Sequence, residues 1–471
     1  MGLAARVAGV TVTFALLAGG GYVAGDIYDV VPGFLTNAPV PEPPAPFPTA
    51  PAATLGGEIT STATLLDPGA PVPAPDQLAE LVQSLVEEED LVGPSVGVLV
   101  TDALTGQELV AHEPDAPQVP ASTVKLLTGV AALTTLGTER TLDTRVVQAT
   151  AGEVVLVGGG DMMLAPGAGD PTSVTARAGL GDLAAQVADA LAARGQAEVT
   201  VRVDDSLFTG PAVSETWLDA NVRLGYVAPV TALAVDVART EDGQYVPRFA
   251  DPSIAAAEVF AQALAESGVS VVGDVARLVV EGEPEVLGSV SSAPLGEIVD
   301  YTLKTSDNTV AEVLGRLVAL EAGLPGSFDG ATAAVLAAVG RTGVDVSRTT
   351  LADCSGLGDG SRIPPRALVQ TLQRASSAEH PVLRRAIVGM PVAGLSGTLY
   401  DRFLESPARG LLRAKTGSLP RTTGLTGSIV TADGRQLYFA VMVDRAPEGG
   451  AWGSRATVDK FVSALAACGC S

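Results

Sequence analysis

Three short stretches of the chain combine residue types that can carry out nucleophilic chemistry. In chain order they are Ser122-Thr123-Val124-Lys125, Ser306-Asp307-Asn308 and Lys415-Thr416-Gly417. The 471 residues include only four lysines and three asparagines, so finding two of these lysines and one of these asparagines inside motifs is hard to attribute to chance.

The first motif pairs a nucleophile with a base. A serine hydroxyl is a weak nucleophile and needs a neighbouring base. A helix is predicted to begin just after Pro120 and to run through Leu133, and residues three apart on a helix share one face. We therefore expect the Lys125 amine to reach the Ser122 hydroxyl. Lysine can act as a base if its pKa is lowered by burial and by a second cation, which Lys415 would supply.

The second motif supplies a hydroxyl and an amide. Ser306 and Asn308 lie two residues apart, so in an extended or turn segment their side chains should point the same way. The Ser306 hydroxyl can relay a proton to a leaving amine, and the Asn308 amide can hold a lysine and a substrate backbone.

The third motif should lie on a strand at a sheet edge. Lys415, Thr416 and Ser418 would present one charge and two hydroxyls to a carboxylate, which suits the C-terminus of a peptide. Gly417 would leave room for a substrate backbone to lie alongside. The backbone N–H groups of Ser122 and Ser418 are candidates for an oxyanion hole.

Composition excludes several other kinds of function. The net charge of −24 would repel nucleic acid. A Ser-His-Asp hydrolase is disfavoured because the only histidines, His112 and His380, lie in no recognisable setting. No cysteine pair has the spacing of a zinc site, so no metal or cofactor is expected. We assign no function to Cys354, Cys468 and Cys470.

The hydrophobic pattern predicts helices around an antiparallel sheet whose strands come from both ends of the chain. A first helix should begin at an Asp76 N-cap, where folded sequence starts near Pro75. A stretch rich in valine and glycine, with one helix, separates the two halves. The predicted strands are Ser95–Thr101, Glu108–Ala111, Val199–Val203, Val269–Val280, Gly424–Thr431 and Gln436–Val443, and the later helices are Ile254–Ser267 and Ala456–Ala467.

The N-terminus has the pattern of an export segment. Residues 7–25 are uncharged and mostly apolar, with Arg6 before them and Asp26 after them, which favours translocation of the rest of the chain. A cleaved signal and a retained membrane anchor both fit; a buried core helix fits poorly because a proline-rich stretch follows. The expected parts are a signal peptide or anchor (1–36), a linker (37–74), a catalytic domain in two pieces (75–150 and 289–471) and one or more inserted β-rich domains (151–288).

The three motifs are the signature set of penicillin-binding proteins and serine β-lactamases. Over roughly residues 90–465 the chain resembles the D-alanyl-D-alanine carboxypeptidases/endopeptidases of the class C penicillin-binding protein 4 type, peptidase family S13. The resemblance implies an α/β fold, with a transpeptidase/β-lactamase-like domain interrupted between the first and second motifs. Further stretches that resemble the family are Gly158–Asp161, Asp204–Phe208, Val227–Leu233, Asp353–Leu357 and Leu395–Leu399.

The resemblance also implies roles for individual residues. Ser122 would be the nucleophile, Lys125 the base, and Ser306 and Asn308 the relay and positioning pair. Asp161 is similar to the family's acidic contact to the free amine of a diaminopimelate side chain, although a turn-capping aspartate explains it equally well. Cys354 stands where the family usually has a small residue. Lys415, Thr416, Gly417 and Ser418 would bind the substrate carboxylate.

The implied substrates are peptidoglycan stem peptides, and the implied inhibitors are β-lactam antibiotics. The protein would act outside the cytoplasm, in the cell envelope, either secreted or anchored by its N-terminal segment. Two alternatives remain: a β-lactamase-type hydrolase on the same scaffold, and a non-catalytic protein that binds the cell wall. Fast deacylation would distinguish the first, and loss of a catalytic side chain is typical of the second.

Overall fold

The computed structural model describes residues 22–23 and 68–468. Apart from residues 22–23, the expected signal or anchor (1–36) lies outside the described residues, as does most of the expected linker (37–74). Within the described ranges, no helix is both long and apolar enough to cross a membrane. Residues 65–471 form one compact unit.

A five-stranded antiparallel sheet joins the two ends of this unit. Its order is β11-β12-β13-β1-β2, so an early strand, β1, pairs with the last one, β13. The prediction of a sheet built from both ends of the chain is thus confirmed. The strands span Val96–Asp102 (β1), Glu108–His112 (β2), Leu412–Leu419 (β11), Thr422–Val430 (β12) and Gln436–Val443 (β13).

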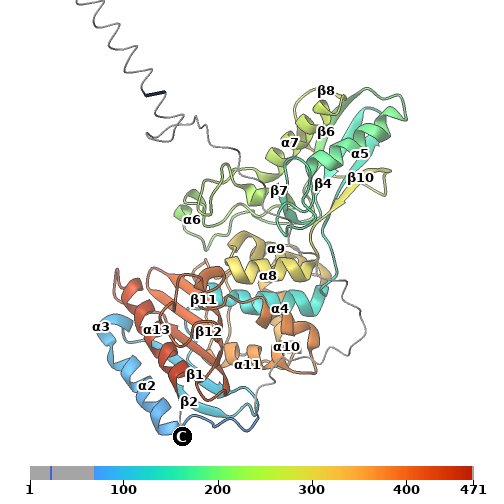
Figure 1. Cartoon of the computed structure of the whole chain (residues 1–471). Coiled ribbons are helices and arrows are strands. Elements are labelled where there is room, and N and C mark those ends of the chain that lie inside the picture. The colour runs from blue at the N-terminus through green and yellow to red at the C-terminus, as the bar shows by residue number, and fades with distance from the viewer. Residues whose placement is uncertain (1–21, 24–67, 469–471) are drawn as a thin grey trace, which may run out of the picture. The chain divides into compact units, whose positions relative to one another are not determined.

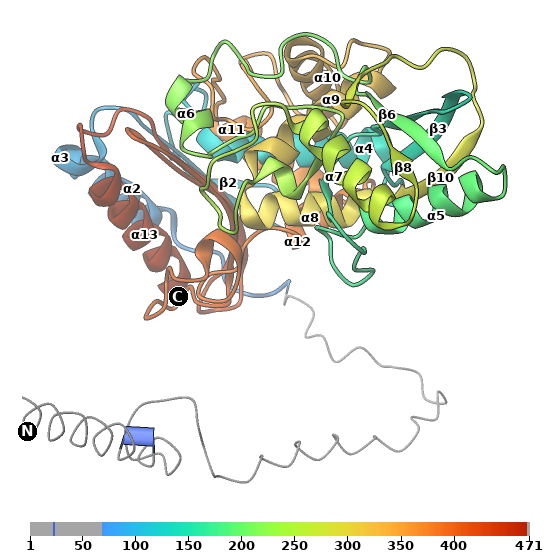
Figure 2. The same ribbon diagram turned by 90° about the horizontal axis from the view of Figure 1, so that it is seen from above.

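Helices cover both faces of this sheet, which explains why β1 is apolar almost throughout. Val98 and Val100 pack into one core with helices α2 (Pro75–Glu87) and α13 (Ala451–Ala467). Leu99, which points the opposite way in the strand, belongs to the core on the other face. Figures 1 and 2 show α2 and α13 together on one side of the sheet.

The other face of the sheet is covered by a layer of helices, and this layer carries the first two motifs. Helix α4 (Val124–Leu136) is its centre and is buried from Val124 through Leu133. Figure 1 shows α4 with α8 and α9 above it and α10 and α11 below it. These neighbours span Leu295–Thr305 (α8), Asn308–Glu321 (α9), Phe328–Arg341 (α10) and Pro365–Ser376 (α11).

A second sheet is formed by the sequence between the first two motifs. Its order is β10-β3-β4-β6-β8, and β9 also pairs with β6. Helices α5 (Leu180–Ala192) and α7 (Pro252–Glu266) pack on it and share its hydrophobic core. The strands are Asp143–Thr150 (β3), Glu153–Val157 (β4), Glu198–Asp204 (β6), Ser270–Val271 (β8), Ala276–Arg277 (β9) and Val286–Ser291 (β10).

Two predictions in this region are wrong. Helix α5 was not expected, because the alanine-rich segment has no capping residue: Gly179 is at its N-cap and makes no side-chain cap bond. The run 269–280 is not one strand but two strands of two residues each, because Gly273 between them has a φ of 73° and turns the chain.

The start of the packed chain also differs from expectation. Arg435 Nη1 donates to the carbonyl groups of Pro68 (2.9 Å) and Ala70 (3.1 Å), so packing begins before Pro75. Ala74, not Asp76, is the N-cap of α2, because Pro75 occupies the first helical position. The remaining elements are α3 (Glu89–Val92), β5 (Asp161–Leu164), α6 (Asp219–Arg223), β7 (Leu233–Val235), α12 (Arg384–Val388), and the 3₁₀ turns η1 (Ala121–Thr123), η2 (Asp236–Ala238), η3 (Pro381–Leu383) and η4 (Gly397–Leu399).

Candidate active site

Ser122 lies in the 3₁₀ turn η1, immediately before helix α4. The Thr123 hydroxyl fixes this turn by donating to the Pro120 carbonyl at 2.7 Å. Ala121 has a φ of 46° and is fully buried, whereas Ser122 is partly exposed. The turn therefore presents the Ser122 hydroxyl toward solvent at the positive end of α4.

Lys125 connects three separate stretches of the chain. Its Nζ lies 3.0 Å from Ser122 Oγ, 2.6 Å from Asn308 Oδ1 and 2.6 Å from the Ser355 carbonyl oxygen. The side chain is completely buried. Burial lowers the pKa of Lys125 to about 8, although neighbouring carboxylates oppose this shift. In order of effect these carboxylates belong to Asp353, Glu312 and Asp307.

Ser306 and Asn308 occupy the connection between helices α8 and α9. Ser306 ends α8 with a φ of 62°, and Asn308 begins α9. Both side chains reach the cluster of two lysines: Asn308 contacts Lys125, and Ser306 contacts Lys415.

Lys415 lies on β11 and is the second buried cation of the site. Its Nζ donates to Ser306 Oγ at 2.9 Å and to the Thr416 carbonyl at 3.0 Å. Burial, and then repulsion from Lys125, lower the pKa of Lys415 well below its usual value. Lys415 was expected to contribute to the lowered pKa of Lys125; in the structure the cause of the lowering is burial.

The rest of the third motif lies along the edge strand β11, as predicted. Thr416 Oγ1 is 2.8 Å from Thr398 Oγ1, and Ser418 is exposed. A Cβ at Gly417 would lie 2.7 Å from the Pro120 carbonyl oxygen. Gly417 therefore permits close contact between β11 and the nucleophile turn, a reason that the sequence did not reveal.

Two buried carboxyl groups behind Lys125 were not predicted as site residues. Asp353 accepts hydrogen bonds from Trp217 Nε1 (2.8 Å) and from the backbone N–H groups of residues 355, 356 and 358. Glu312 accepts from Cys354 N with both oxygens at 3.1 Å. Burial and the Asp353 charge raise the pKa of Glu312 to about 8. Together they fix the loop whose Ser355 carbonyl meets Lys125.

A signal for Glu312 was present in the sequence. It lies four residues after Asn308, one helical turn along the same face, within an otherwise apolar run. Cys354 is fully buried with its Sγ against Gly315, where a Cβ would be 2.3 Å away. Burial raises the pKa of the Cys354 thiol well above its usual range.

Asp161 makes none of the contacts described for the Ser122–Lys125 cluster. It lies in β5 with 2% of its surface exposed, and its Oδ1 accepts from Met163 N at 2.8 Å. Burial raises the pKa of Asp161 to about 7. A turn-capping aspartate would make this hydrogen bond. The contact of Asp161 with a substrate amine stays a prediction. Across residues 22–23 and 68–468, no group of three or more His, Cys, Asp or Glu side chains is placed to hold a metal ion.

Comparison with known proteins covers most of the chain. The model of the D-Ala-D-Ala carboxypeptidase 3 (S13) family matches residues 78–247 and 238–465. A carboxypeptidase of Mycobacterium tuberculosis is 38% identical over 394 residues, which are 80% of this chain and 82% of the relative. Carboxypeptidase DacB of Mycolicibacterium smegmatis is 36% identical over 418 residues, 86% of this chain and 87% of the relative.

The fold has a counterpart among solved structures. Penicillin binding protein 4 from Haemophilus influenzae superposes with a TM-score of 0.67 at 21% identity, covering 82% of this chain and 98% of that structure. This likeness establishes the α/β penicillin-binding fold. Together with the family model and the two relatives, it shows that the chain belongs to the D-Ala-D-Ala carboxypeptidase 3 (S13) family of serine peptidases.

Proposed function

We propose that Ser122 is the nucleophile with which this D-Ala-D-Ala carboxypeptidase removes the terminal D-alanine from peptidoglycan stem peptides. The observation that carries the proposal is the position of Lys125 Nζ, 3.0 Å from Ser122 Oγ and fully buried. A pKa of about 8 leaves part of the lysine as the neutral amine near neutral pH, which is the form that can accept a proton.

The first half of the reaction forms an acyl-enzyme. Ser122 Oγ bonds to the carbonyl carbon between the two D-alanines while its proton passes to Lys125 Nζ. The tetrahedral oxyanion would be held by the backbone N–H groups of Ser122 and Ser418. The C–N bond then breaks, and the proton that Lys125 took from Ser122 passes through the Ser306 hydroxyl, which also contacts Lys415, to the leaving amine. In the second half a water molecule attacks the ester and releases the shortened peptide and Ser122.

The substrate C-terminus would lie along β11. Thr416 and Ser418 offer hydroxyls, and Lys415 places a cation within reach of the same edge. Ser122, Ser306 and Ser418 are all partly or fully exposed, whereas the two lysines are buried. A peptide can therefore reach the hydroxyls while the amines stay desolvated.

The same arrangement supports two further proposals. A β-lactam ring would acylate Ser122 in place of the peptide carbonyl. An endopeptidase reaction would differ only in the group attached to the leaving amine.

Two proposals concern the rest of the chain. Residues 7–25 would carry the protein out of the cytoplasm, as a cleaved signal or a retained anchor. Residues 151–288 would form a domain inserted into the catalytic one.

Release of D-alanine from a purified stem pentapeptide tests the assignment. The wild-type protein should release one equivalent of D-alanine per peptide, and Ser122→Ala should lower the rate at least about 10³-fold. Ser270→Ala, an exposed serine of the second sheet, should behave as wild type. Equal rates for wild type and Ser122→Ala would contradict the proposal.

A further inference from the structure

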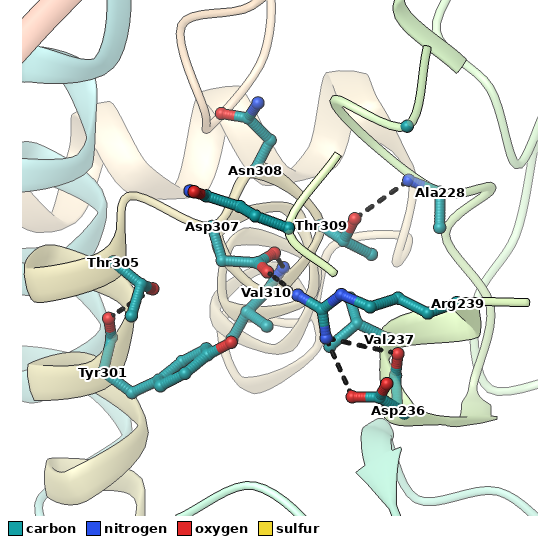
Figure 3. Close-up of polar contacts among 12 residues, drawn as sticks. Ala228, Asp236, Val237, Arg239, Tyr301, Thr305, Asp307, Asn308, Thr309 and Val310 are labelled. Atoms are coloured by element: carbon teal, nitrogen blue, oxygen red, sulfur yellow. Dashed lines mark hydrogen bonds and ion pairs between the residues drawn. The ribbon is translucent and has the colours of Figure 1, made fainter. Parts of the chain in front are cut away.

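One segment of the region between the first two motifs, residues 226–239, holds the second motif in place. The Asn308 Nδ2 amide donates to the Tyr226 carbonyl at 2.8 Å. One residue further along α9, Thr309 Oγ1 accepts from Ala228 N at 2.9 Å. Figure 3 shows Ala228 and Thr309 facing each other across this contact. The Asn308 side chain, which contacts Lys125, is thus itself held by a segment outside the helical layer.

The same segment reaches the residue between Ser306 and Asn308. Arg239 Nη2 lies 3.6 Å from Asp307 Oδ2, and both side chains are mostly buried, with 12% and 9% of their surface exposed. The other carboxylate oxygen of Asp307 caps α9 by accepting from Val310 N at 3.0 Å. Asp307 therefore joins the start of α9 to Arg239, and three consecutive residues, 307–309, contact one segment.

The backbone that presents Arg239 is strained. Asp236, Val237 and Ala238 have φ values of 43°, 52° and 58°, in the left-handed region that disfavours residues with a side chain. Such a backbone is unfavourable for any residue with a side chain, and a β-branched valine is an extreme case. A strained turn next to a catalytic cluster persists only where its surroundings fix it.

Two arginines fix this turn. Arg248 donates to the Val237 carbonyl at 3.0 Å and to the Gly225 carbonyl at 2.9 Å, which ties the turn to the residue before Tyr226. Arg239 Nη1 donates to Asp236 Oδ1 at 2.8 Å, within the turn itself. These hydrogen bonds therefore fix the orientation of the Arg239 guanidinium that faces Asp307.

We propose that Arg239 is a positioning residue: through Asp307 it fixes residues 306–308 so that Asn308 holds Lys125 and Ser306 meets Lys415. The proposal rests on the function proposed above. It assigns to the region between the first two motifs a part in assembling the catalytic cluster, through a charge pair that joins Asp307 of the second motif to Arg239, which belongs to none of the three motifs.

The proposal predicts a change in the pKa of Lys125 that a purely structural role for Arg239 would not produce. The Asp307 carboxylate raises the pKa of Lys125, and Arg239 neutralises part of that carboxylate. Removing the carboxylate should lower the pKa of Lys125, and removing the guanidinium should raise it. Besides Asp307, the titratable groups that face Lys125 are Glu312 on α9, Asp353 on its loop and Lys415 on β11. The titratable groups around the Arg239–Asp307 pair are Asp236, Arg248, Tyr245 and Tyr301.

The test measures acylation of the full-length protein by a chromogenic β-lactam between pH 5.5 and 9.5. Asn retains the oxygen that caps α9, so Asp307→Asn removes the charge and places an amide NH2 group where the second oxygen faces Arg239. Arg239→Gln and Asp307→Asn should each lower the plateau rate about tenfold, within the loss that a misplacement of about 1 Å can cause. The midpoint of the acidic limb should move up by about half a pH unit in Arg239→Gln and down by a similar amount in Asp307→Asn.

The double variant and two controls complete the design. The plateau rate of Arg239→Gln/Asp307→Asn should match that of Asp307→Asn alone, because the guanidinium positions residues 306–308 only through the carboxylate. The midpoint of the double variant should lie near that of wild type, because two opposite charges are removed together. Arg239→Lys keeps the charge and should keep the wild-type midpoint. Arg202→Gln breaks a more exposed ion pair with Glu153 in the second sheet and should leave both rate and midpoint unchanged.

Several results would overturn the proposal. These are a shift of both single variants in the same direction, additive losses in the double variant, or a plateau rate in Arg239→Gln within twofold of wild type. If Arg239→Gln shows no cooperative thermal unfolding, Asp307→Asn and Arg239→Lys decide the question by their midpoints. Absence of β-lactam on Ser122 in the wild-type protein would instead contradict the function proposed above.

Discussion

Lys125 illustrates how burial alone can prepare a catalytic base. An ammonium group with no access to water loses its hydration, which favours the neutral amine. The Asn308 oxygen and the Ser355 carbonyl at 2.6 Å keep the amine oriented toward Ser122. Asp353 and Glu312, behind that carbonyl, limit how far the pKa falls. The result is a base whose pKa of about 8 lies near physiological pH.

This environment predicts a defined pH dependence. Acylation by a β-lactam should rise with pH and reach half of its plateau near pH 8, because deprotonation converts Lys125 into the form that accepts the Ser122 proton. Lys125→Arg, which stays charged, should acylate about 10²–10⁴-fold more slowly than the wild-type plateau and should show no rise with pH. Lys460→Arg, an exposed lysine, is the matched control. A wild-type rate that is flat or falling between pH 6 and pH 9 would disprove the assignment of Lys125 as base.

Residue spacing predicted the contacts within one motif better than those between motifs. The three-residue spacing of Ser122 and Lys125 was sufficient, since a helical turn fixes their separation. The pairing of Lys415 with Ser306 spans 109 residues and was not predicted. Arg239 and the left-handed Val237 gave no signal, because neither the residue types nor their spacing mark that turn.

At the scale of elements, the site depends on close contact between β11 and the turn η1. Gly417 and Gly424, paired across β11 and β12, both lie against this turn. A Cβ at Gly417 would come within 2.7 Å of the Pro120 carbonyl and 3.2 Å of Thr123 Cγ2. The Pro120 carbonyl is backbone and cannot rotate away, so the strand would have to move.

Gly417→Ala should therefore damage catalysis more than folding. We expect acylation to fall about 10²-fold, since a displacement of β11 by about 1 Å moves Lys415 and Ser418 relative to Ser122. The thermal midpoint should fall by only a few degrees. Gly167→Ala, where a Cβ meets no atom within 4 Å, is the control. Acylation within twofold of wild type would show that the close contact is not required.

Elements with strong local signals were predicted well, and those without them were missed. Asp433-Gly434 marks the turn between β12 and β13, and both strands were predicted to within two residues at each end. Helix α5 lacks a side chain at its N-cap and a basic residue in its last turn, so its alanine-rich sequence carried little information. The strands β8 and β9 have two residues each, which is too short for an alternating pattern to be visible.

At the scale of the whole unit, the five-stranded sheet brings together segments from both ends of the chain. Asp102 at the end of β1 accepts from Arg435 Nε at 2.8 Å, although 333 residues separate them. Their side chains are 1% and 5% exposed. Burial alone would raise the pKa of Asp102, but hydrogen bonds from Arg435 and from the Leu104 and Thr105 N–H groups give a net lowering.

Breaking this pair should destabilise the unit. Asp102→Asn leaves the Arg435 guanidinium buried without a counter-charge, at a cost of about 3–5 kcal/mol. The double variant Asp102→Asn/Arg435→Met should recover part of this loss, as thermal unfolding of the four proteins of the cycle would show. Because the pKa of Asp102 is lowered on folding, its contribution is present above pH 4 and is lost as the pH falls below that value. Unchanged unfolding midpoints would contradict a stabilising role.

The central claim is that Ser122 becomes acylated. The most direct measurement is the intact mass of the protein after incubation with benzylpenicillin, followed by peptide mapping. We predict a gain of one penicilloyl group, located on Ser122 and retained for many minutes, and no gain in Ser122→Ala. A penicilloyl group on another residue, or none at all, would contradict the account, and release within seconds would favour a β-lactamase-type hydrolase.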